Sequence, residues 1–385
     1  MSKVFIIAGE ISGDAHGAGL IQAMLDSRPD TEFLGLGGPR MRAVAGAGID
    51  DWIADAAVLG LWEVLKMYGW FKQRFDQALA LMAKEKPEAV ILIDYPGFNL
   101  RIAKAIRQAG LPVKILYYIS PQVWAWKKGR IKTMARVLNL MICIFPFEKD
   151  LYEKSGLRTV FAGHPMVDRV KAESGQIQRE RKLVGILPGS RANEIKRILP
   201  TLLAAAALIR RDLPEARFTI SAANDRMVEE MRPLIAQSPV PEATQWIEVG
   251  RAHDLMQRAE VGMVTSGTAT LEAACFGLPY VLVYRVNPMT YAVGKAVVRI
   301  KHLGMINILA GREVVREFVQ GDLTPQNLAT ELLALLHDDQ RRAQLTEDLR
   351  TAAATLGEGG AYQRAAQAVL QELLPSAEAA TPLTA

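Results

Sequence analysis

Short apolar runs alternate with helical patterns along almost the whole chain, and this alternation constrains the fold more than any other feature. In the first half the runs are "KVFIIAG", "AVILID", "KILYYIS", "LMICIF" and "TVFAGHP". Segments between them, such as "NLRIAKAIRQAG", carry the period of a helix. Strands without polar alternation, spaced by helices, are typical of a parallel sheet covered on both faces. The sequence therefore predicts an α/β fold.

A second series of the same kind follows a charged stretch, and this repetition predicts two domains. The stretch "RVKAESGQIQRERK", residues 169–182, lacks strong apolar periodicity and is expected to be a linker. Beyond it lie the runs "LVGILPGS", "RFTISAA", "QWIEVG", "VGMVTSG" and "PYVLVYR". A chain of 385 residues is long for one core and suits two. We expect doubly wound domains over 1–168 and 183–375, the second including the final helices, and a flexible tail over 376–385.

Composition narrows the classes of partner and compartment. A formal charge of +5 and a pI near 9.1 favour anionic partners, which include nucleotides, phosphates, acidic lipid and nucleic acid. Cys143 and Cys275 lie in apolar contexts, which indicates core residues in a reducing compartment. We expect no signal peptide and no membrane-spanning segment. Neither H-E-x-x-H nor C-x-x-C occurs, so we predict no structural metal.

The stretch "AGEISGDAHGAGL", residues 8–20, follows the first apolar run and is richer in polar groups than a simple turn needs. Ligands of doubly wound sheets lie outside the carboxyl ends of the strands, where Glu10, Ser12, Asp14 and His16 are expected. Its small residues let a backbone approach a ligand at the start of a helix. The alternative is a tight turn capped by Ser12 or Asp14, with His16 as a structural hydrogen-bonding residue.

Asp94 ends the run "AVILID" and is the first candidate for a general base. A carboxylate at a strand end is partly desolvated, which raises its pKa toward the range of a usable base. The alternative is a turn or capping aspartate before Pro96. Four further polar residues follow the ends of this run and the next, and they are candidates for contact with a substrate: Asn99, Ser120, Gln122 and Trp124.

Two loops of the second domain suit a diphosphate. Gly189, Ser190 and Arg191 in "LPGSRANEI" offer backbone N–H groups, a hydroxyl and a guanidinium that matches phosphate oxygens. The second loop, Ser266, Gly267 and Thr268 in "TSGTATLE", is small and polar at an expected helix start, and Glu272 lies one turn later, where it can accept from a ribose. Two ordinary capped turns are the alternative.

Residues 59–75, "LGLWEVLKMYGWFKQRF", have an aromatic stripe beside basic residues. At helical spacing the apolar and aromatic positions share one region, and Lys66, Lys72 and Arg74 border it: Leu61, Trp62, Leu65, Tyr68, Trp70 and Phe71. Such a stripe is either a core helix or a membrane-interface patch. The basic stretch "WAWKKGRIKTMAR", residues 124–136, adds a nucleic-acid alternative, which ranks lower because no recognised nucleic-acid module accompanies it.

These motifs together resemble one family. The chain is similar to the lipid-A-disaccharide synthases over about residues 3–335, in "AGEISGDAHGAGL", "GLGGPRM", "IDYPGFN", "SPQVWAWKKGRIKT", "FPFEKDLYEK", "FAGHPMVD", "LPGSRANEI", "TSGTATLEA" and "NILAGREVVREF". The resemblance implies two Rossmann-like domains facing across a cleft in the GT-B arrangement. It implies an inverting, metal-independent transfer without cofactor from UDP-2,3-diacylglucosamine to 2,3-diacylglucosamine 1-phosphate (lipid X), giving a β-1,6-linked disaccharide phosphate and UDP.

The resemblance also implies partners and residue roles. The family forms homodimers with exchanged C-terminal segments and works peripherally on the cytoplasmic face of the inner membrane; no nucleic acid is expected. UDP is expected at Arg191, the 266–268 loop, Glu272 and Asn307. Asn307 is taken from the family motif alone, because it follows the last strand expected in the second sheet.

The acceptor and the base are then expected in the first domain. Asp94 is the first choice for the base, Glu10 and Asp14 are reserves, and His16 is expected to orient one of them. Two alternatives remain: another UDP-sugar enzyme, such as a 2-epimerase or a different sugar transferase, and a binding protein without turnover.

Overall fold

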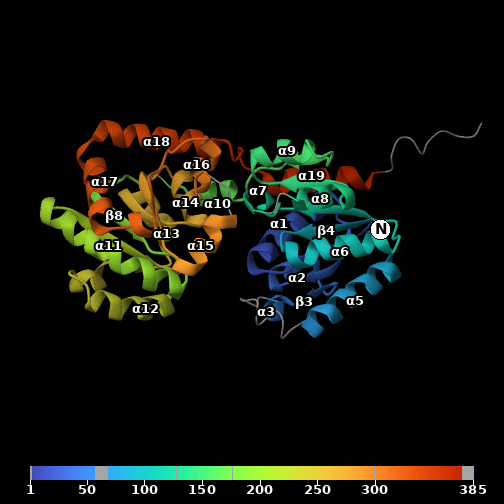
Figure 1. Ribbon diagram of the computed structural model, residues 1–385. Helices are drawn as coiled ribbons and strands as arrows, with labels where there is room; N and C mark the ends of the chain where they lie inside the picture. The colour runs from blue at the N-terminus through green and yellow to red at the C-terminus, as the bar shows by residue number, and fades with distance from the viewer. Residues whose placement is uncertain (1, 57–67, 127–128, 176, 298–300, 375–385) are drawn as a thin grey trace, which may run out of the picture. The chain divides into compact units, whose positions relative to one another are not determined.

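The computed structural model describes residues 2–56, 68–126, 129–175, 177–297 and 301–374 (Figure 1). The chain forms two compact units: Met1–Pro165 together with Gly357–Ala385, and Met166–Leu356. Each unit contains one parallel sheet, which confirms the predicted fold class. The tail expected at 376–385 lies outside the described residues. In the described part of the chain, no helix is long and apolar enough to cross a bilayer.

The first sheet has the order β3-β2-β1-β4-β5-β6-β7, and all its pairings are parallel. Val4 of the central strand pairs with Phe33 on one side and Ala89 on the other. The strands are β1 (Lys3–Ala8), β2 (Glu32–Gly37), β3 (Ile49–Asp51), β4 (Ala89–Ile93), β5 (Lys114–Tyr118), β6 (Leu140–Cys143) and β7 (Thr159–Phe161). Every apolar run named in the first half is a strand; β2 and β3 were not predicted.

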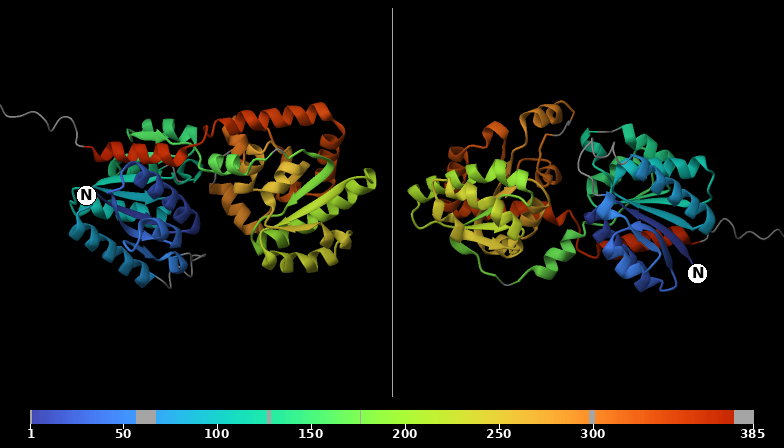
Figure 2. Two further views of the ribbon diagram at one scale, coloured as in Figure 1. Left: turned by 180° about the vertical axis from the view of Figure 1, so that it is seen from behind. Right: turned by 90° about the horizontal axis from the view of Figure 1, so that it is seen from below.

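Helices cover this sheet on both faces (Figures 1 and 2). Phe5 and Ile7 of β1 join an apolar cluster with α5, α6 and α8, while Val4 and Ile6 are equally buried on the opposite face. This double burial explains the continuous apolar runs. The helices are α1 (Ile11–Ser27), α2 (Pro39–Ala45), α3 (Ile53–Ala56), α5 (Tyr68–Glu85), α6 (Pro96–Gln108), α7 (Val123–Trp126), α8 (Gly129–Val137), α9 (Pro146–Glu153) and α19 (Ala361–Leu373).

The final helix belongs to the first unit, which corrects the expectation that it would complete the second. α19 lies beside α1, as its red colour shows in Figures 1 and 2. Gly19 makes this approach possible, because a Cβ there would lie 2.6 Å from the Tyr362 ring. Glu372 is buried and pairs with Arg158. The contacting residues lie far apart in sequence, so no local pattern reveals them.

The second sheet has the order β10-β9-β8-β11-β12-β13, again parallel. Its strands are β8 (Glu180–Leu187), β9 (Arg217–Ala222), β10 (Ile247–Val249), β11 (Ala259–Thr265), β12 (Tyr280–Tyr284) and β13 (Glu317–Val319). The edge strand β13 was not predicted. Asn307 therefore precedes the last strand, contrary to our expectation, because the short polar-flanked β13 lacks a long apolar run.

The helices of this unit form two groups around the sheet. α11, α12 and α17 share one apolar cluster, whereas α14, α16 and α18 contact one another. The helices are α10 (Met166–Glu173), α11 (Ala192–Asp212), α12 (Asp225–Ala236), η1 (Pro241–Trp246), α13 (Ala252–Arg258), α14 (Thr268–Cys275), α15 (Pro288–Val297), α16 (Met305–Ala310), η2 (Gln320–Asp322), α17 (Pro325–His337) and α18 (Asp339–Ala354).

The expected linker over 169–182 is largely regular structure and needs correction. α10 continues to Glu173, and β8 begins at Glu180. Met166 and Val170 are buried one helical turn apart, so α10 does have an apolar face. Most other residues of this stretch are charged, so the sequence showed no clear apolar periodicity there.

Candidate active site

Both sheets reverse their strand order at loops that the sequence singled out. The first sheet reverses between β1 and β4, and the second between β8 and β11. Ligands of open α/β sheets bind at such switch points, outside the carboxyl ends of the strands. Glu10 follows β1 and Asp94 follows β4. Loops 189–191 and 266–267 follow β8 and β11, so each unit carries one candidate site.

The backbone around Asp94 is strained and held in place. Asp94 and Tyr95 have φ values of 40° and 46°, in the left-handed region that residues other than glycine rarely adopt. Asp94 N donates to Tyr118 O at 3.1 Å, and Asp94 O accepts from Asn99 Nδ2 at 2.8 Å and from the Tyr117 hydroxyl. Strain of this kind persists where surrounding contacts over-determine it, and it is frequent at active sites.

Burial raises the pKa of Asp94 to about 7, and the negative charge of Glu10 adds to the rise. A carboxyl group that titrates near neutrality suits general base catalysis. The Glu10 carboxylate accepts a hydrogen bond from Ser12 Oγ at the start of α1. Gly9 leaves room for the Tyr95 ring, since a Cβ there would lie 2.3 Å from Tyr95 Cδ1. The loops after β1 and β4 therefore pack directly on each other.

Asp14 has a structural role that its motif did not reveal. Its Oδ1 accepts from the backbone N–H groups of Gly38 and Met41, each at 2.9 Å, and its Oδ2 accepts from Arg40 N at 3.0 Å. The carboxylate thus caps the N-terminus of α2. We no longer propose Asp14 as a reserve base. His16 Nδ1 lies 3.0 Å from the hydroxyl of Tyr362 on α19. This hydrogen bond to a residue near the C-terminus orients the imidazole.

The acceptor-side candidates divide into buried and exposed residues. Asn99 is buried, and its amide bridges the carbonyls of Ile93 and Asp94. Ser120 is also buried, Trp124 is half-buried and Gln122 is exposed.

Sequence reasoning missed Glu148 of α9. It is fully buried, accepts from Trp124 Nε1 at 3.2 Å, and has its pKa raised by burial to about 8. Glu148 Oε2 accepts from the Phe145 backbone N–H at 3.4 Å, but Phe145 has no side-chain acceptor, so the sequence shows no capping-box pattern that would have revealed Glu148.

In the second unit, two helices begin at the switch point. Gly189 has φ 104° and Gly267 has φ 153°, which glycine adopts without strain. Arg191 is the N-cap of α11, and its exposed guanidinium pairs with Glu194 at 2.7 Å. Thr268 begins α14. The backbone N–H groups at these two helix starts, with a guanidinium beside one of them, are suited to binding a diphosphate.

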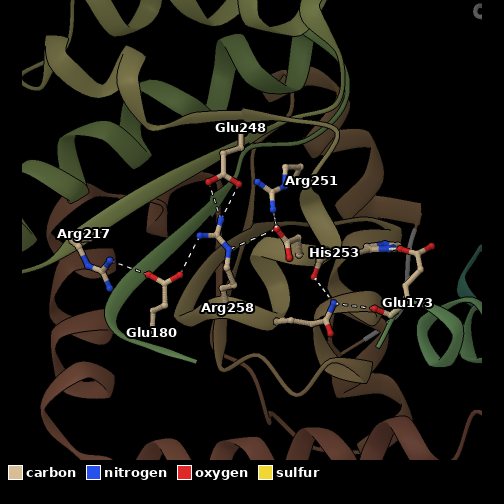
Figure 3. A network of polar contacts seen from close by, with 9 residues as sticks. Glu173, Glu180, Arg217, Glu248, Arg251, His253 and Arg258 are labelled. Carbon is tan, nitrogen blue, oxygen red and sulfur yellow. Dashed lines mark hydrogen bonds and ion pairs between the residues drawn. The ribbon is translucent and has the colours of Figure 1, made fainter. Parts of the chain in front are cut away.

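Glu272 is buried on α14 and is held by two basic partners. Arg169 of α10 forms an ion pair with it, and His253 Nε2 lies 3.3 Å from its Oε1. Burial raises the pKa of Glu272, but His253 and Arg169 outweigh this effect and lower it overall. The bond to Glu272 raises the pKa of His253, which also contacts Glu173, as Figure 3 shows. A ribose bound at Glu272 must share this carboxylate with Arg169.

A neighbouring network of charges stabilises the same unit. Arg258 bonds both carboxylate oxygens of Glu248 at 2.8 Å and reaches Glu180 at 3.2 Å (Figure 3). Glu180 also pairs with Arg217 at 2.9 Å. These charges are engaged with one another, which indicates a structural role.

The Asn307 side chain makes all its hydrogen bonds within the protein. Its Nδ2 donates to Val315 O and to Glu317 Oε1, each at 2.8 Å, and its Oδ1 accepts from Val314 N and Val315 N. An amide has two donors and two acceptor positions, and all four are used. We therefore no longer propose Asn307 as a direct UDP ligand; it shapes the loop between α16 and β13.

The aromatic stripe is described only in part. Leu61, Trp62 and Leu65 lie outside the described residues, as does the side chain of Tyr68. Trp70 is half-buried and stacks on the fully buried Trp52, with ring centroids 5.7 Å apart. Phe71 packs on the same core cluster. The membrane-interface assignment stays a prediction, and Trp70 and Phe71 are anchored in the core. Within the described ranges, no three His, Cys, Asp or Glu residues are grouped to hold a metal ion.

Comparison with known proteins decides the family. The profile described as Lipid-A-disaccharide synthetase matches residues 4–372. The chain belongs to the lipid-A-disaccharide synthase family. The lipid-A-disaccharide synthase of Trichlorobacter lovleyi is 40% identical over 376 residues, covering 96% of this chain and 97% of that protein. The one from Geobacter sulfurreducens is 38% identical over 381 residues, covering 96% and 97%.

Solved structures agree at the level of the fold. The calicheamicin glycosyltransferase CalG4 has a TM-score of 0.58 at 14% identity, covering 97% of this chain and 98% of that one. The UDP-GlcNAc 2-epimerase of Neisseria meningitidis, bound to UDP-GlcNAc, has a TM-score of 0.58 at 12% identity, covering 96% and 100%. The chain thus has the two-domain α/β fold of GT-B enzymes, as the family resemblance implied.

Proposed function

We propose that this protein transfers the diacylglucosamine of UDP-2,3-diacylglucosamine to the 6-hydroxyl of 2,3-diacylglucosamine 1-phosphate, with inversion at the anomeric carbon. The products are the β-1,6-linked disaccharide 1-phosphate and UDP. Membership of the lipid-A-disaccharide synthase family carries this proposal. The chemistry of the two switch points supports it, since one carries a carboxyl poised near neutrality and the other suits a diphosphate.

Asp94 acts as the general base on the first unit. Its carboxylate takes the proton of the acceptor's 6-hydroxyl as that oxygen attacks the anomeric carbon. Such proton transfer contributes about 10²–10⁴-fold to rate. A pKa of about 7 means that a large fraction is ionised at neutral pH, while the carboxylate remains more basic than an ordinary aspartate. Burial keeps the pKa of Asp94 high and the charge of Glu10 adds to the effect; Glu10 is also the remaining reserve for the role.

The second unit binds UDP and stabilises it as a leaving group. The N-termini of α11 and α14 direct backbone N–H groups toward the diphosphate, and Arg191 adds a positive charge. Charge that develops on the departing diphosphate is then met by groups already in place. Glu272 accepts a hydrogen bond from a ribose hydroxyl and gives up part of its ion pair with Arg169 when it does so.

A UDP-release assay tests the function directly. With donor and acceptor together we expect stoichiometric UDP and disaccharide phosphate, and with donor alone neither product. A 2-epimerase, the class to which some structural neighbours belong, converts donor without acceptor. Conversion of donor in the absence of acceptor therefore contradicts the proposal, as does tight binding of both substrates without turnover.

We also propose a homodimer with exchanged C-terminal segments that works peripherally on the cytoplasmic face of the inner membrane. The family resemblance supports both the dimer and the membrane location. The acyl chains of both substrates support the membrane location. Within the 59–75 stretch, Trp62 and Lys66 are of the residue types that a membrane interface favours, whereas Trp70 and Phe71 pack on the core cluster.

A further inference from the structure

Three side chains of α9 hold the loop that follows β5. Glu148 is fully buried; its Oε1 accepts from Trp124 Nε1 at 3.2 Å, and its carboxyl also bonds the Ser120 side chain. Ser120 Oγ lies 2.5 Å from the Tyr152 hydroxyl. The Phe147 ring packs edge-on against Trp124, with centroids 5.1 Å apart. Ser120 and Trp124 are thus fixed through one helix.

This loop needs such support because its backbone is strained. Ile119, directly before Ser120, has φ 63°, a conformation that is costly for a β-branched residue. The loop is also coupled to the base. Tyr118 O accepts from Asp94 N, and the Tyr117 hydroxyl donates to Asp94 O. A shift at the end of β5 therefore reaches Asp94 at the end of β4.

We propose that Glu148 is a positioning residue for the acceptor, which fixes Ser120 and Trp124 beside Asp94 at the carboxyl edge of the first sheet. This inference rests on the proposed function, since it supposes that the acceptor is bound by this loop. Glu148 itself is buried and acts only through its partners. Its loss therefore raises the acceptor KM while UDP affinity, a property of the second unit, stays unchanged.

Glu148 acts in its neutral form. Burial raises the pKa of Glu148 to about 8, so the carboxyl is protonated at pH 7. The groups that bond to it are the side chains of Ser120 and Trp124 and the backbone N–H groups of Ile144 and Phe145, and its titratable neighbours are Cys143 and Tyr152. Burial raises the pKa of Cys143 and of Tyr152, so both are neutral; the exposed Lys149 and Glu153 act on Cys143.

Ionisation of Glu148 then loosens the loop. A carboxylate in a fully buried pocket is costly, and water must enter to solvate it. As pH rises through about 8 we expect the acceptor KM of the wild-type protein to rise. Glu148→Gln keeps the shape and an acceptor oxygen for Trp124 but has no proton to lose, so its acceptor KM stays flat to pH 9.

The test compares wild type, Glu148→Gln, Glu148→Ala and the matched control Glu153→Gln, an exposed carboxylate on the same helix. Steady-state UDP release with varied acceptor gives KM and kcat from pH 6.5 to 9, and calorimetry gives UDP affinity. We expect Glu148→Ala to raise the acceptor KM by roughly 10–100-fold, the scale of a misplacement near 1 Å. Glu153→Gln should match wild type.

A second measurement is independent of turnover. The indole N–H resonance of Trp124, assigned by its loss in Trp124→Phe, should shift with an apparent pKa near 8 in wild type and not in Glu148→Gln. An unchanged acceptor KM in Glu148→Ala, or an alkaline rise in KM that persists in Glu148→Gln, overturns the inference. Absence of turnover in wild type overturns the proposed function instead, and the resonance still reports whether Glu148 holds Trp124.

Discussion

Asp94→Asn should lower the rate of transfer and, at pH 8, raise the stability of the fold. The substitution keeps the side-chain shape and leaves the backbone contacts of residue 94 with Tyr118, Asn99 and Tyr117 in place. It removes the proton acceptor. We therefore expect turnover to fall by about 10²–10⁴-fold with UDP affinity unchanged.

The stability effect follows from the raised pKa. A folded-state pKa of about 7, against 3.8 for an ordinary aspartate, means that the folded protein binds the proton more tightly than the unfolded chain. Stability is then greatest at low pH and falls as pH rises from about 4 to about 7. A rise of about three units corresponds to about 4 kcal/mol as an upper limit, and partial exposure of the carboxyl reduces this to about 1–3 kcal/mol.

Asn carries no charge, so Asp94→Asn should be more stable than wild type at pH 8 and nearly equal to it at pH 4. For a unit of this size, about 1 kcal/mol shifts Tm by about 2–4 °C. Melting curves across pH measure the difference, with Asp150→Asn, an exposed carboxylate of the same unit, as the control.

Two results would refute the reasoning about Asp94. Turnover near the wild-type rate would move the base to Glu10. A Tm difference that does not depend on pH would mean that the folded protein does not hold a costly charge at position 94.

The remaining predictions concern the second site, a helix cap and the aromatic stripe. Arg191→Ala should weaken UDP binding by about 1.5–3 kcal/mol in calorimetry with an unchanged melting curve, and unchanged affinity would remove Arg191 from the site. Asp14→Asn should lower stability by about 1–3 kcal/mol in urea unfolding, because three backbone N–H groups lose a charged acceptor; an unaltered midpoint contradicts this. Trp70→Ser should lower Tm through its stacking on Trp52, whereas Trp62→Ser should reduce flotation with anionic vesicles at constant Tm, and the reverse pattern would contradict both assignments.

The sequence predicted the fold well because burial on both faces of a parallel sheet produces long apolar runs. Strands β1 and β4 are fully or nearly fully apolar, and each was recognised. The edge strands β3 and β13 were missed, and so was the internal strand β2, whose apolar residues are interrupted by glycines. The edge strands β7 and β10 are equally short and were recognised, so strand length alone does not explain the misses. The final helix was assigned to the wrong unit because its partners, such as Arg158 for Glu372, are distant in sequence.

The candidate site was predictable in position but less so in role. Strand ends pointed to Asp94 and Arg191 because topology alone brings such residues to the switch points. Whether a polar residue faces a ligand or the protein depends on long-range contacts. Asp14 caps a helix 24 residues away, and Asn307 binds a loop that follows it. Neither contact leaves a pattern at the residue itself.

Asp94 and Glu148 impose opposite requirements on the same edge of the first sheet. The base must be ionised, which favours pH above about 7, whereas the positioning carboxyl must be neutral, which favours pH below about 8. Both pKa values are raised mainly by burial, so the apolar packing at this edge sets both the acidic and the alkaline limit of the pH range in which the enzyme is active. The acidic limit should appear in kcat, because it concerns proton transfer, and the alkaline limit in the acceptor KM, because it concerns the loop. Since Glu148→Gln keeps the side-chain shape and so leaves the packing around Asp94 in place, it should remove the alkaline limit and keep the acidic one.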